Sequence, residues 1–252
     1  MKKKLVLLLA MAINVFSLAS CRIMSRELFE EYTFDKVVSL NLEVGGFDVE
    51  LIASERDGGK VEIIYPDHYS ISCRSVELNS GNQIQIEAPR MEKLSMFNFA
   101  RQKIILRVPG NIQVNLEGRS SNVTISDFTS IRGRFSTSSG DIKVVNSSGS
   151  LEMTTFAGNI LMDGIKGVFN LKTSSGDIKA VRMHLEKNSS LKTGAGKINL
   201  DLLNHRENLQ FLIDTRSGDI YYYGQRLEKD QHLGSGEIIV SMETGSGNIQ
   251  IQ

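Results

Sequence analysis

The tetrapeptide Ser-Gly-Asp-Ile recurs through the second half of this 252-residue chain. It occurs three times in full, and four variants keep both the glycine and the isoleucine two positions later. The seven glycines are separated by 18, 18, 20, 22, 18 and 11 residues: Gly140, Gly158, Gly176, Gly196, Gly218, Gly236 and Gly247. A unit of about 20 residues cannot bury its own apolar face, so neighbouring units must stack. The repeat therefore predicts a solenoid and argues against most enzyme folds.

Apolar and polar residues alternate around each glycine. Such alternation predicts strands with one buried face, with outward residues such as Lys143 and Lys179 between inward ones. A threonine lies three positions before the glycine in six units, where its hydroxyl can bond the backbone of the corner. In the unit at Gly236, Leu233 replaces the threonine, and we expect irregular stacking there. The isoleucines are expected to form one buried column: Ile142, Ile160, Ile178, Ile198, Ile220, Ile238 and Ile249.

Two sets of corners are expected in each coil. Glycine reaches positive φ without steric cost and therefore suits a tight turn between short strands. A second set, at Ser148–Ser150 and Lys166–Val168, lies about halfway between the repeated glycines. We predict an all-β, right-handed parallel β-helix or solenoid with Ser-Gly-Asp-Ile corner repeats, because parallel crossovers are right-handed in nearly all cases. The alternative is an antiparallel β-sandwich, which also has closely spaced short strands.

The N-terminus has the pattern of an export signal. Lys2, Lys3 and Lys4 precede an apolar run, Leu5–Phe16, which is short for a transmembrane helix. The following Leu18-Ala19-Ser20-Cys21 resembles the bacterial lipobox, in which the cysteine becomes lipidated with palmitate-type acyl chains. The resemblance implies that residues 1–20 are a lipoprotein signal peptide and that Cys21 anchors the protein to a membrane of the bacterial cell envelope, facing the periplasm or the exterior. The alternative is an ordinary cleaved signal peptide.

The remainder of the chain is expected to form one domain. Residues 21–33 are interpreted as a tether, with room for a helical turn, and residues 34–252 as a β-solenoid domain. The domain is less regular over residues 34–117 and regular over residues 118–252. A helix or irregular insertion is expected at Met91–Ala100.

Three stretches carry a family resemblance. Ile105–Pro109, Val114–Glu117 and the Ser-Gly-Asp-Ile run, with Val44–Val49 as a degenerate early copy, resemble the bacterial putative-adhesin family of β-solenoid domains of unknown function. The resemblance spans residues 34–252. It implies the solenoid fold and a binding role, and it implies little chemistry.

The sequence contains no convincing catalytic or metal-binding motif. Asp141, Asp177 and Asp219 would suit a calcium ladder, but Asn159 and Lys197 interrupt the column. Corner hydrogen bonding is the preferred interpretation, and no metal, cofactor or catalytic residue is predicted. We therefore expect a non-enzymatic protein. The enzymatic alternative is a carbohydrate-active β-helix enzyme such as a polysaccharide lyase.

The charge balance bears on partners. The chain has 29 basic and 29 acidic residues, and loss of residues 1–20 would give a net charge of about −3. Nucleic acid is therefore not an expected partner. Cys73 is expected to be a small buried apolar residue rather than a reactive thiol.

Tyr221-Tyr222-Tyr223 is the one aromatic cluster. Alternation predicts that Tyr222 points inward and that Tyr221 and Tyr223 point outward, as a surface for a sugar ring or a partner. The other interpretation is that the two outward rings cover a loop.

The chain stops within a repeat, at Ile249–Gln252. An open last coil needs a cover, because it presents unpaired backbone groups. Either the insert at Leu227–His232 folds over it, or it pairs with a second copy, as a homodimer, or with an envelope protein; we favour pairing. The predicted function is an adhesin-like binding or scaffolding module for a glycan, a host molecule or an envelope protein. The alternative is a sensory or regulatory partner of a membrane complex.

Overall fold

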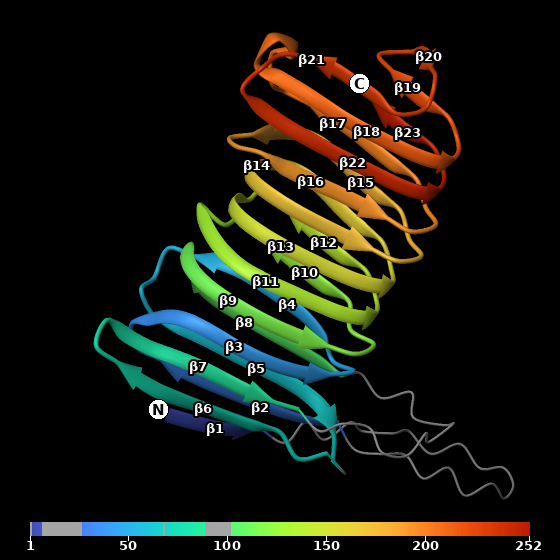
Figure 1. Ribbon diagram of the computed structural model, residues 1–252. Helices are drawn as coiled ribbons and strands as arrows, with labels where there is room; N and C mark the ends of the chain where they lie inside the picture. The colour runs from blue at the N-terminus through green and yellow to red at the C-terminus, as the bar shows by residue number, and fades with distance from the viewer. Residues whose placement is uncertain (1, 7–26, 68, 89–101) are drawn as a thin grey trace, which may run out of the picture.

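The structure is a computed structural model that describes residues 2–6, 27–67, 69–88 and 102–252. Within these residues every regular element is a β-strand, except for one 3-10 turn at Arg206–Asn208. The strands lie side by side along an elongated body, with the N-terminal strands at one end and β20 and β21 at the other (Figure 1). The expected insertion at Met91–Ala100 lies outside the described residues.

The strands form two walls, which we call sheet A and sheet B, joined through β14. In spatial order, sheet A contains β6 (Ser72–Leu78), β7 (Gly81–Glu87), β3 (Val37–Gly45), β9 (Asn111–Gly118), β11 (Ser130–Ser139), β13 (Ser148–Ala157), the second half of β14 (Ile160–Thr173), β16 (Ser189–Thr193), β22 (Ile238–Ser246), β18 (Leu209–Ser217) and β21 (Gln231–Gly234).

Sheet B contains the other strands. In spatial order these are β1 (Lys2–Val6), β2 (Glu27–Phe34), β5 (Gly59–Pro66), β8 (Lys103–Pro109), β4 (Asp48–Ser54), β10 (Val123–Ser126), β12 (Ile142–Val145), the first half of β14, β15 (Ile178–Leu185), β17 (Ile198–Leu202), β23 (Ile249–Ile251), β19 (Ile220–Tyr222) and β20 (Gln225–Leu227).

Parallel pairing dominates both walls and confirms a β-solenoid rather than an antiparallel sandwich. Antiparallel pairs occur only near the two ends of the body, among β1, β2, β5 and β8, between β6 and β7, and where β20 and β21 join their neighbours. Each coil thus crosses the molecule twice, once in each wall, which gives a flattened solenoid. The right-handed sense of winding stays a prediction.

The buried isoleucine column is confirmed at six of its seven positions. The six are paired in direct register and are at most 1% exposed: Ile142, Ile160, Ile178, Ile198, Ile249 and Ile220. Lys179, next to Ile178, is exposed, as alternation requires. Ile238 is the exception, because it pairs with Leu209 in sheet A and is only half-buried. This is the irregular stacking expected for the unit at Gly236.

The corner glycines touch one another from coil to coil. A Cβ atom added to Gly176 would lie 1.9 Å from the carbonyl oxygen of Gly158, so no larger residue fits. The same carbonyl accepts a hydrogen bond from the buried Thr173 hydroxyl at 2.9 Å. Four further threonines donate in the same way to a corner glycine of the adjacent coil, at 2.8–3.2 Å: Thr155, Thr193, Thr215 and Thr244. The threonines therefore join coils, rather than closing their own turn as expected.

The tether expected at residues 21–33 is wrong for its second half. Residues 27–34 form strand β2, which pairs antiparallel with β5 over its whole length and buries Tyr32 and Phe34. The physical reason is the edge of β5, which would otherwise present unpaired N–H and C=O groups. The domain therefore begins before Phe34.

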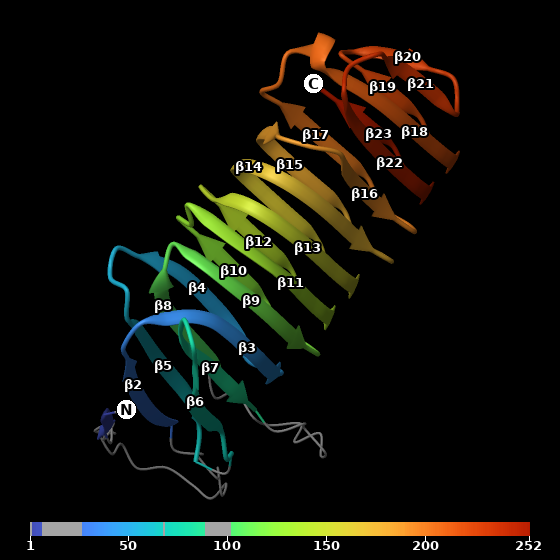
Figure 2. The same cartoon turned by 60° about the vertical axis from the view of Figure 1, so that its left-hand side comes forward.

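The prediction of an open C-terminal coil is also wrong. Strand β22 lies between β16 and β18, and β23 lies between β17 and β19 (Figures 1 and 2). The last coil of the sequence is thus inserted between two earlier ones. The outermost coil is formed by β18 and β19, and β20 and β21 pair antiparallel with these two strands. The segment with β20 and β21 thus covers the outermost coil, much as in the first alternative, in which the insert at Leu227–His232 folds over the end. The basis for a homodimer through the C-terminal coil is thereby removed.

The N-terminal part is interleaved in the same manner. Strand β3 lies between β7 and β9, and β4 lies between β8 and β10, although β3 and β4 precede all four in the sequence. Sheet A therefore ends at β6 rather than at the earlier strand β3, whereas sheet B ends at β1 and β2, the first two strands of the chain.

We expect Ile178→Ala to lower the free energy of unfolding by about 2–5 kcal/mol, because it removes fully buried methylene groups from the column. Lys179→Ala, at the adjacent outward position, should change it by less than about 0.5 kcal/mol. Urea denaturation of the two variants measures the difference. Equal losses at the two positions would contradict the alternation.

The interleaved order predicts that the last strand supports coils on both sides. Ile251→Ala should speed amide hydrogen exchange in β17 and in β19, because Ile251 is buried between Leu200 and Tyr222. Gln250→Ala, one position earlier and half-exposed, serves as the control. Faster exchange in β19 alone would show that β23 does not lie against β17.

Candidate functional site

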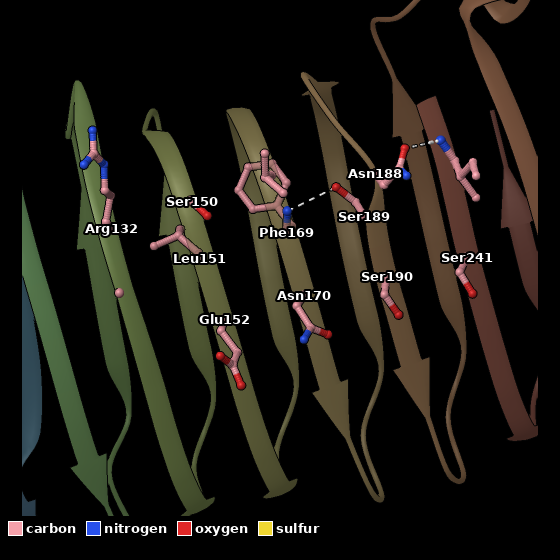
Figure 3. Close-up of a pocket in the computed structure, with 13 residues that line it drawn as sticks. Arg132, Ser150, Leu151, Glu152, Phe169, Asn170, Asn188, Ser189, Ser190 and Ser241 are labelled. Atoms are coloured by element: carbon pink, nitrogen blue, oxygen red, sulfur yellow. Dashed lines mark hydrogen bonds between the residues drawn. The ribbon is translucent and has the colours of Figure 1, made fainter. Parts of the chain in front are cut away.

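An open groove of about 620 Å³ lies on the outer side of sheet A (Figure 3). It crosses five neighbouring strands, β11, β13, β14, β16 and β22. Its outward-facing lining residues are Arg132, Ser150, Glu152, Val168, Asn170, Asn188, Ser190, Ile239 and Ser241. No residue of the groove had been singled out from the sequence as a binding residue.

One row of the lining carries a single polar side chain per strand. Glu152, Asn170, Ser190 and Ser241 are consecutive register partners on β13, β14, β16 and β22. Figure 3 shows them following one another across the strands. Arg134 of β11 begins the row and forms an ion pair with Glu152 at 2.9 Å.

The groove is hollow because its outward positions carry short side chains, whereas the adjacent outward row carries long ones. In the adjacent outward row the register partners are Lys172, Lys192 and Glu243. Lys192 and Glu243 form an ion pair at 2.6 Å. These longer side chains form a rim beside the shorter serines Ser190 and Ser241.

The other outward row is partly apolar. Ser150 and Val168 are register partners, and Ile239 lies further along the same level on β22. Val168 and Ile239 are half-buried. The side-chain oxygen of Asn188 accepts a hydrogen bond from the Ile239 backbone N–H at 2.9 Å, which holds this amide at the groove.

The groove contains polar side chains with unused hydrogen-bonding capacity. Within the part of the chain that the structure describes, the side chains of Ser150, Asn170, Ser190 and Ser241 make no hydrogen bond to another residue. They are therefore available to a ligand. The one carboxylate, Glu152, is already paired with Arg134, so the groove offers binding groups rather than a pair of acids for catalysis.

The aspartate and asparagine column forms a hydrogen-bond ladder between coils. The Asp177 carboxylate accepts from the Lys197 backbone N–H at 2.7 Å, and Asn159 accepts from the Asp177 N–H at 2.9 Å. Asp141 accepts from the Asn159 N–H at 2.7 Å. Lys197 has no acceptor to continue the series. In the described residues no group of three or more His, Cys, Asp or Glu side chains is placed to hold a metal ion.

The three tyrosines do not form the expected outward pair. Tyr222 packs edge-on against Phe211 at 5.6 Å between ring centroids, and burial raises its pKa. Strand β19 ends there, and Tyr223 and Gly224 form a two-residue turn with φ of 47° and 84°. The Tyr223 ring therefore turns back onto Tyr222 at 4.7 Å and lies under the Arg206 guanidinium at 3.2 Å. The outward position predicted for Tyr223 is wrong, because alternation stops where the strand stops.

Tyr221 faces the outer side of sheet B, away from the groove. Its hydroxyl lies 3.4 Å from Asp219, which is paired with Arg226 at 2.6 Å. The hydrogen bond to Asp219 raises the pKa of the Arg226 guanidinium. A second hollow of about 420 Å³ adjoins this pair. Tyr221 and Tyr223 thus belong to different environments near the covered end of the solenoid.

The two cysteines were also singled out. Cys21 lies outside the described residues. Cys73, on β6, forms no disulfide within the described residues; it is half-buried and packs against the core, so it is less buried than expected.

The sequence was compared with models of known protein families. The model of Toastrack DUF4097 matches residues 37–252. The chain belongs to this family. The match covers the interleaved solenoid and confirms the resemblance seen in Ile105–Pro109 and the Ser-Gly-Asp-Ile run. No curated protein matches the chain.

Several solved structures have a similar course of the chain. A putative adhesin from Bacteroides fragilis has 14% identity and a TM-score of 0.48, covering 90% of this chain and 97% of its own. A putative cell adhesion protein from Clostridium sporogenes has 13% identity and a TM-score of 0.39, covering 88% and 97%. A putative lipid binding protein from Parabacteroides distasonis has 16% identity and a TM-score of 0.38, covering 88% and 96%. All three TM-scores are below 0.5, so membership rests on the family match.

A search for membrane-spanning helices gives a simple result. Among the described residues, none forms a helix of the length and apolarity that a bilayer crossing requires.

The hydrogen-bond ladder predicts how position 177 responds to substitution. Asp177→Asn keeps an acceptor for the Lys197 N–H and should be nearly neutral, whereas Asp177→Ala should cost about 1 kcal/mol of unfolding free energy. Thermal unfolding of both variants, with calcium and with a chelator, measures this. A melting temperature that rises with calcium in the parent protein and not in Asp177→Ala would instead support a calcium ladder.

Proposed function

We propose that this protein is a non-enzymatic binding module of the bacterial cell envelope, anchored by lipid on Cys21, with the groove of sheet A as its binding face. The observation that carries the proposal is the groove itself. It combines unpaired serine and asparagine side chains with half-buried apolar ones on strands that are paired on both sides. Such a surface suits recognition, because a rigid scaffold holds the contact residues in place.

The lack of a catalytic constellation in the groove supports a non-enzymatic role. An inverting or retaining glycosidase needs two carboxyl groups that flank the scissile bond. The groove lining contains only Glu152, and Arg134 holds it in an ion pair. The names of the similar structures, a putative adhesin and a putative cell adhesion protein, agree with a binding role at the cell surface.

The lipid anchor is supported by the order of residues 2–21. Three lysines, an apolar run and Leu18-Ala19-Ser20-Cys21 follow one another as in bacterial lipoproteins. Only residues 22–26 separate Cys21 from β2. The six steps between successive Cα atoms from Cys21 to Glu27 span at most about 22 Å, so an acylated Cys21 holds the N-terminal end of the solenoid close to the membrane. Cleavage before Cys21 would also remove β1, and with it the partner of β2 at that edge.

Cys21→Ala tests the anchor. In cells fed an alkyne analogue of palmitate, the parent protein should carry the label and sediment with membranes, and the variant should do neither. Cys73→Ala is the matched control, because it removes the other cysteine and should leave labelling unchanged. A Cys21→Ala variant that still carries fatty acid would overturn the lipid anchor.

A further inference from the structure

We propose that the groove on sheet A binds a linear, extended glycan that runs across the strands, with about one sugar for each strand. The inference rests on the proposed binding function and adds the class of ligand. It is argued from the spacing of the groove, from the chemistry of its lining and from the ligands that the groove does not suit.

The first argument is spacing. Adjacent strands in a sheet are about 4.8 Å apart, so register partners repeat at that interval along the solenoid. Asn170, Ser190 and Ser241 are such partners on consecutive strands, and none of their side chains bonds to another described residue. Five strands give a groove about 19 Å long. A pyranose unit in an extended chain has nearly the length of one strand interval, so hydroxyl groups of successive sugars would meet successive polar side chains.

The second argument is chemical. A sugar ring has hydroxyl groups on its edge and C–H groups on its faces. The row at Asn170, Ser190 and Ser241 offers donors and acceptors to the edge, and Val168 and Ile239 offer apolar contact to a face. Both kinds of contact lie in the same groove: the polar row has one residue on each of β14, β16 and β22, and the apolar contacts lie on β14 and β22. Neutral lining residues dominate, Glu152 is balanced by Arg134, and Arg132 is the one further charge in the lining, so a glycan with little charge fits best.

Other polymers suit the groove less well. A peptide that adds as a β-strand needs a free sheet edge, and every strand under the groove is paired on both sides. A nucleic acid needs a basic stripe, and within the groove Arg132 is the only cationic lining residue. A lipid chain needs a continuous apolar channel, and the row of Asn170, Ser190 and Ser241 interrupts the apolar contacts.

The groove also indicates how strong binding should be. Its aromatic residue, Phe169, is 2% exposed and cannot stack on a sugar. A single glycan chain bound by hydrogen bonds and small apolar contacts, without stacking, is expected to bind in the millimolar range. Many copies anchored on one membrane would add their contacts, so a weak single site is compatible with firm attachment to a polymer.

The test is titration of the full chain, purified in a detergent without a sugar headgroup, with oligosaccharides of defined linkage. Isothermal titration or NMR shifts should show binding of cellohexaose, a β-1,4-linked extended hexamer. Maltohexaose, an α-1,4-linked hexamer that curls, should bind at least about tenfold more weakly, because it cannot place one sugar on each strand. Affinity should rise with length up to about five sugars and then level off.

Ser190→Trp should fill the middle of the groove and weaken cellohexaose binding at least about tenfold. Asn199→Trp, at an outward half-exposed position on β17 of sheet B, should leave binding unchanged. Asn170→Ala gives a second variant that removes hydrogen bonds without adding bulk, and it should weaken binding severalfold. Unchanged thermal unfolding shows that each variant is folded.

The inference is overturned if the parent protein binds no cellohexaose at millimolar concentration, if Ser190→Trp binds as the parent does, or if affinity is independent of length. If the protein does not bind cellohexaose but Cys21 is labelled with palmitate, the glycan proposal is refuted and the proposal of a lipid-anchored envelope protein is retained. Loss of labelling alongside groove-dependent binding would refute the anchor alone.

Discussion

The stack depends on the carbonyl oxygen of each corner glycine. At Gly158 this oxygen accepts the Thr173 hydroxyl of the next coil, and it leaves no room for a Cβ atom on Gly176. Close approach and a buried hydrogen bond therefore occur at the same atom. Because the contact is repeated along the solenoid, it keeps the coils at strand distance and keeps equivalent residues in register. The isoleucine column and the polar rows of sheet A both follow from that register.

Much of the regular half of the fold could be predicted from the sequence. Period-two alternation placed Ile178 inside and Lys179 outside, because a strand has only two faces. The aspartate column was interpreted as corner hydrogen bonding, and Asp177 bonds in that way, although to the neighbouring coil. These features depend on local geometry and on identical neighbours, which a repeat displays directly.

The remainder depends on pairings that local pattern does not encode. The sequence order of Gly196, Gly218 and Gly247 gives no sign that the last coil stacks between the other two. Tyr223 departs from alternation because the strand ends one residue earlier. The groove arises from short side chains on neighbouring strands, and its last strand, β22, lies far from β16 in the chain. Serine at outward positions, with Ser190 and Ser241 in one row and Ser150 in the next, was the available signal, and it acquires meaning only once the register is known.

The insertion of β22 and β23 between earlier strands sets an order of events during synthesis. The strands β18 and β19 emerge before their neighbours β22 and β23 exist, so they cannot take their final place when they appear. Strands β18 and β19 must either stay undocked until β22 and β23 are made, or pair with β16 and β17 in a non-native arrangement and then detach. The solenoid is therefore finished from its C-terminal residues, and a chain halted before Ile238 keeps apolar strand edges open to other chains. Completion of the last few residues acts as the closing step for the whole C-terminal half.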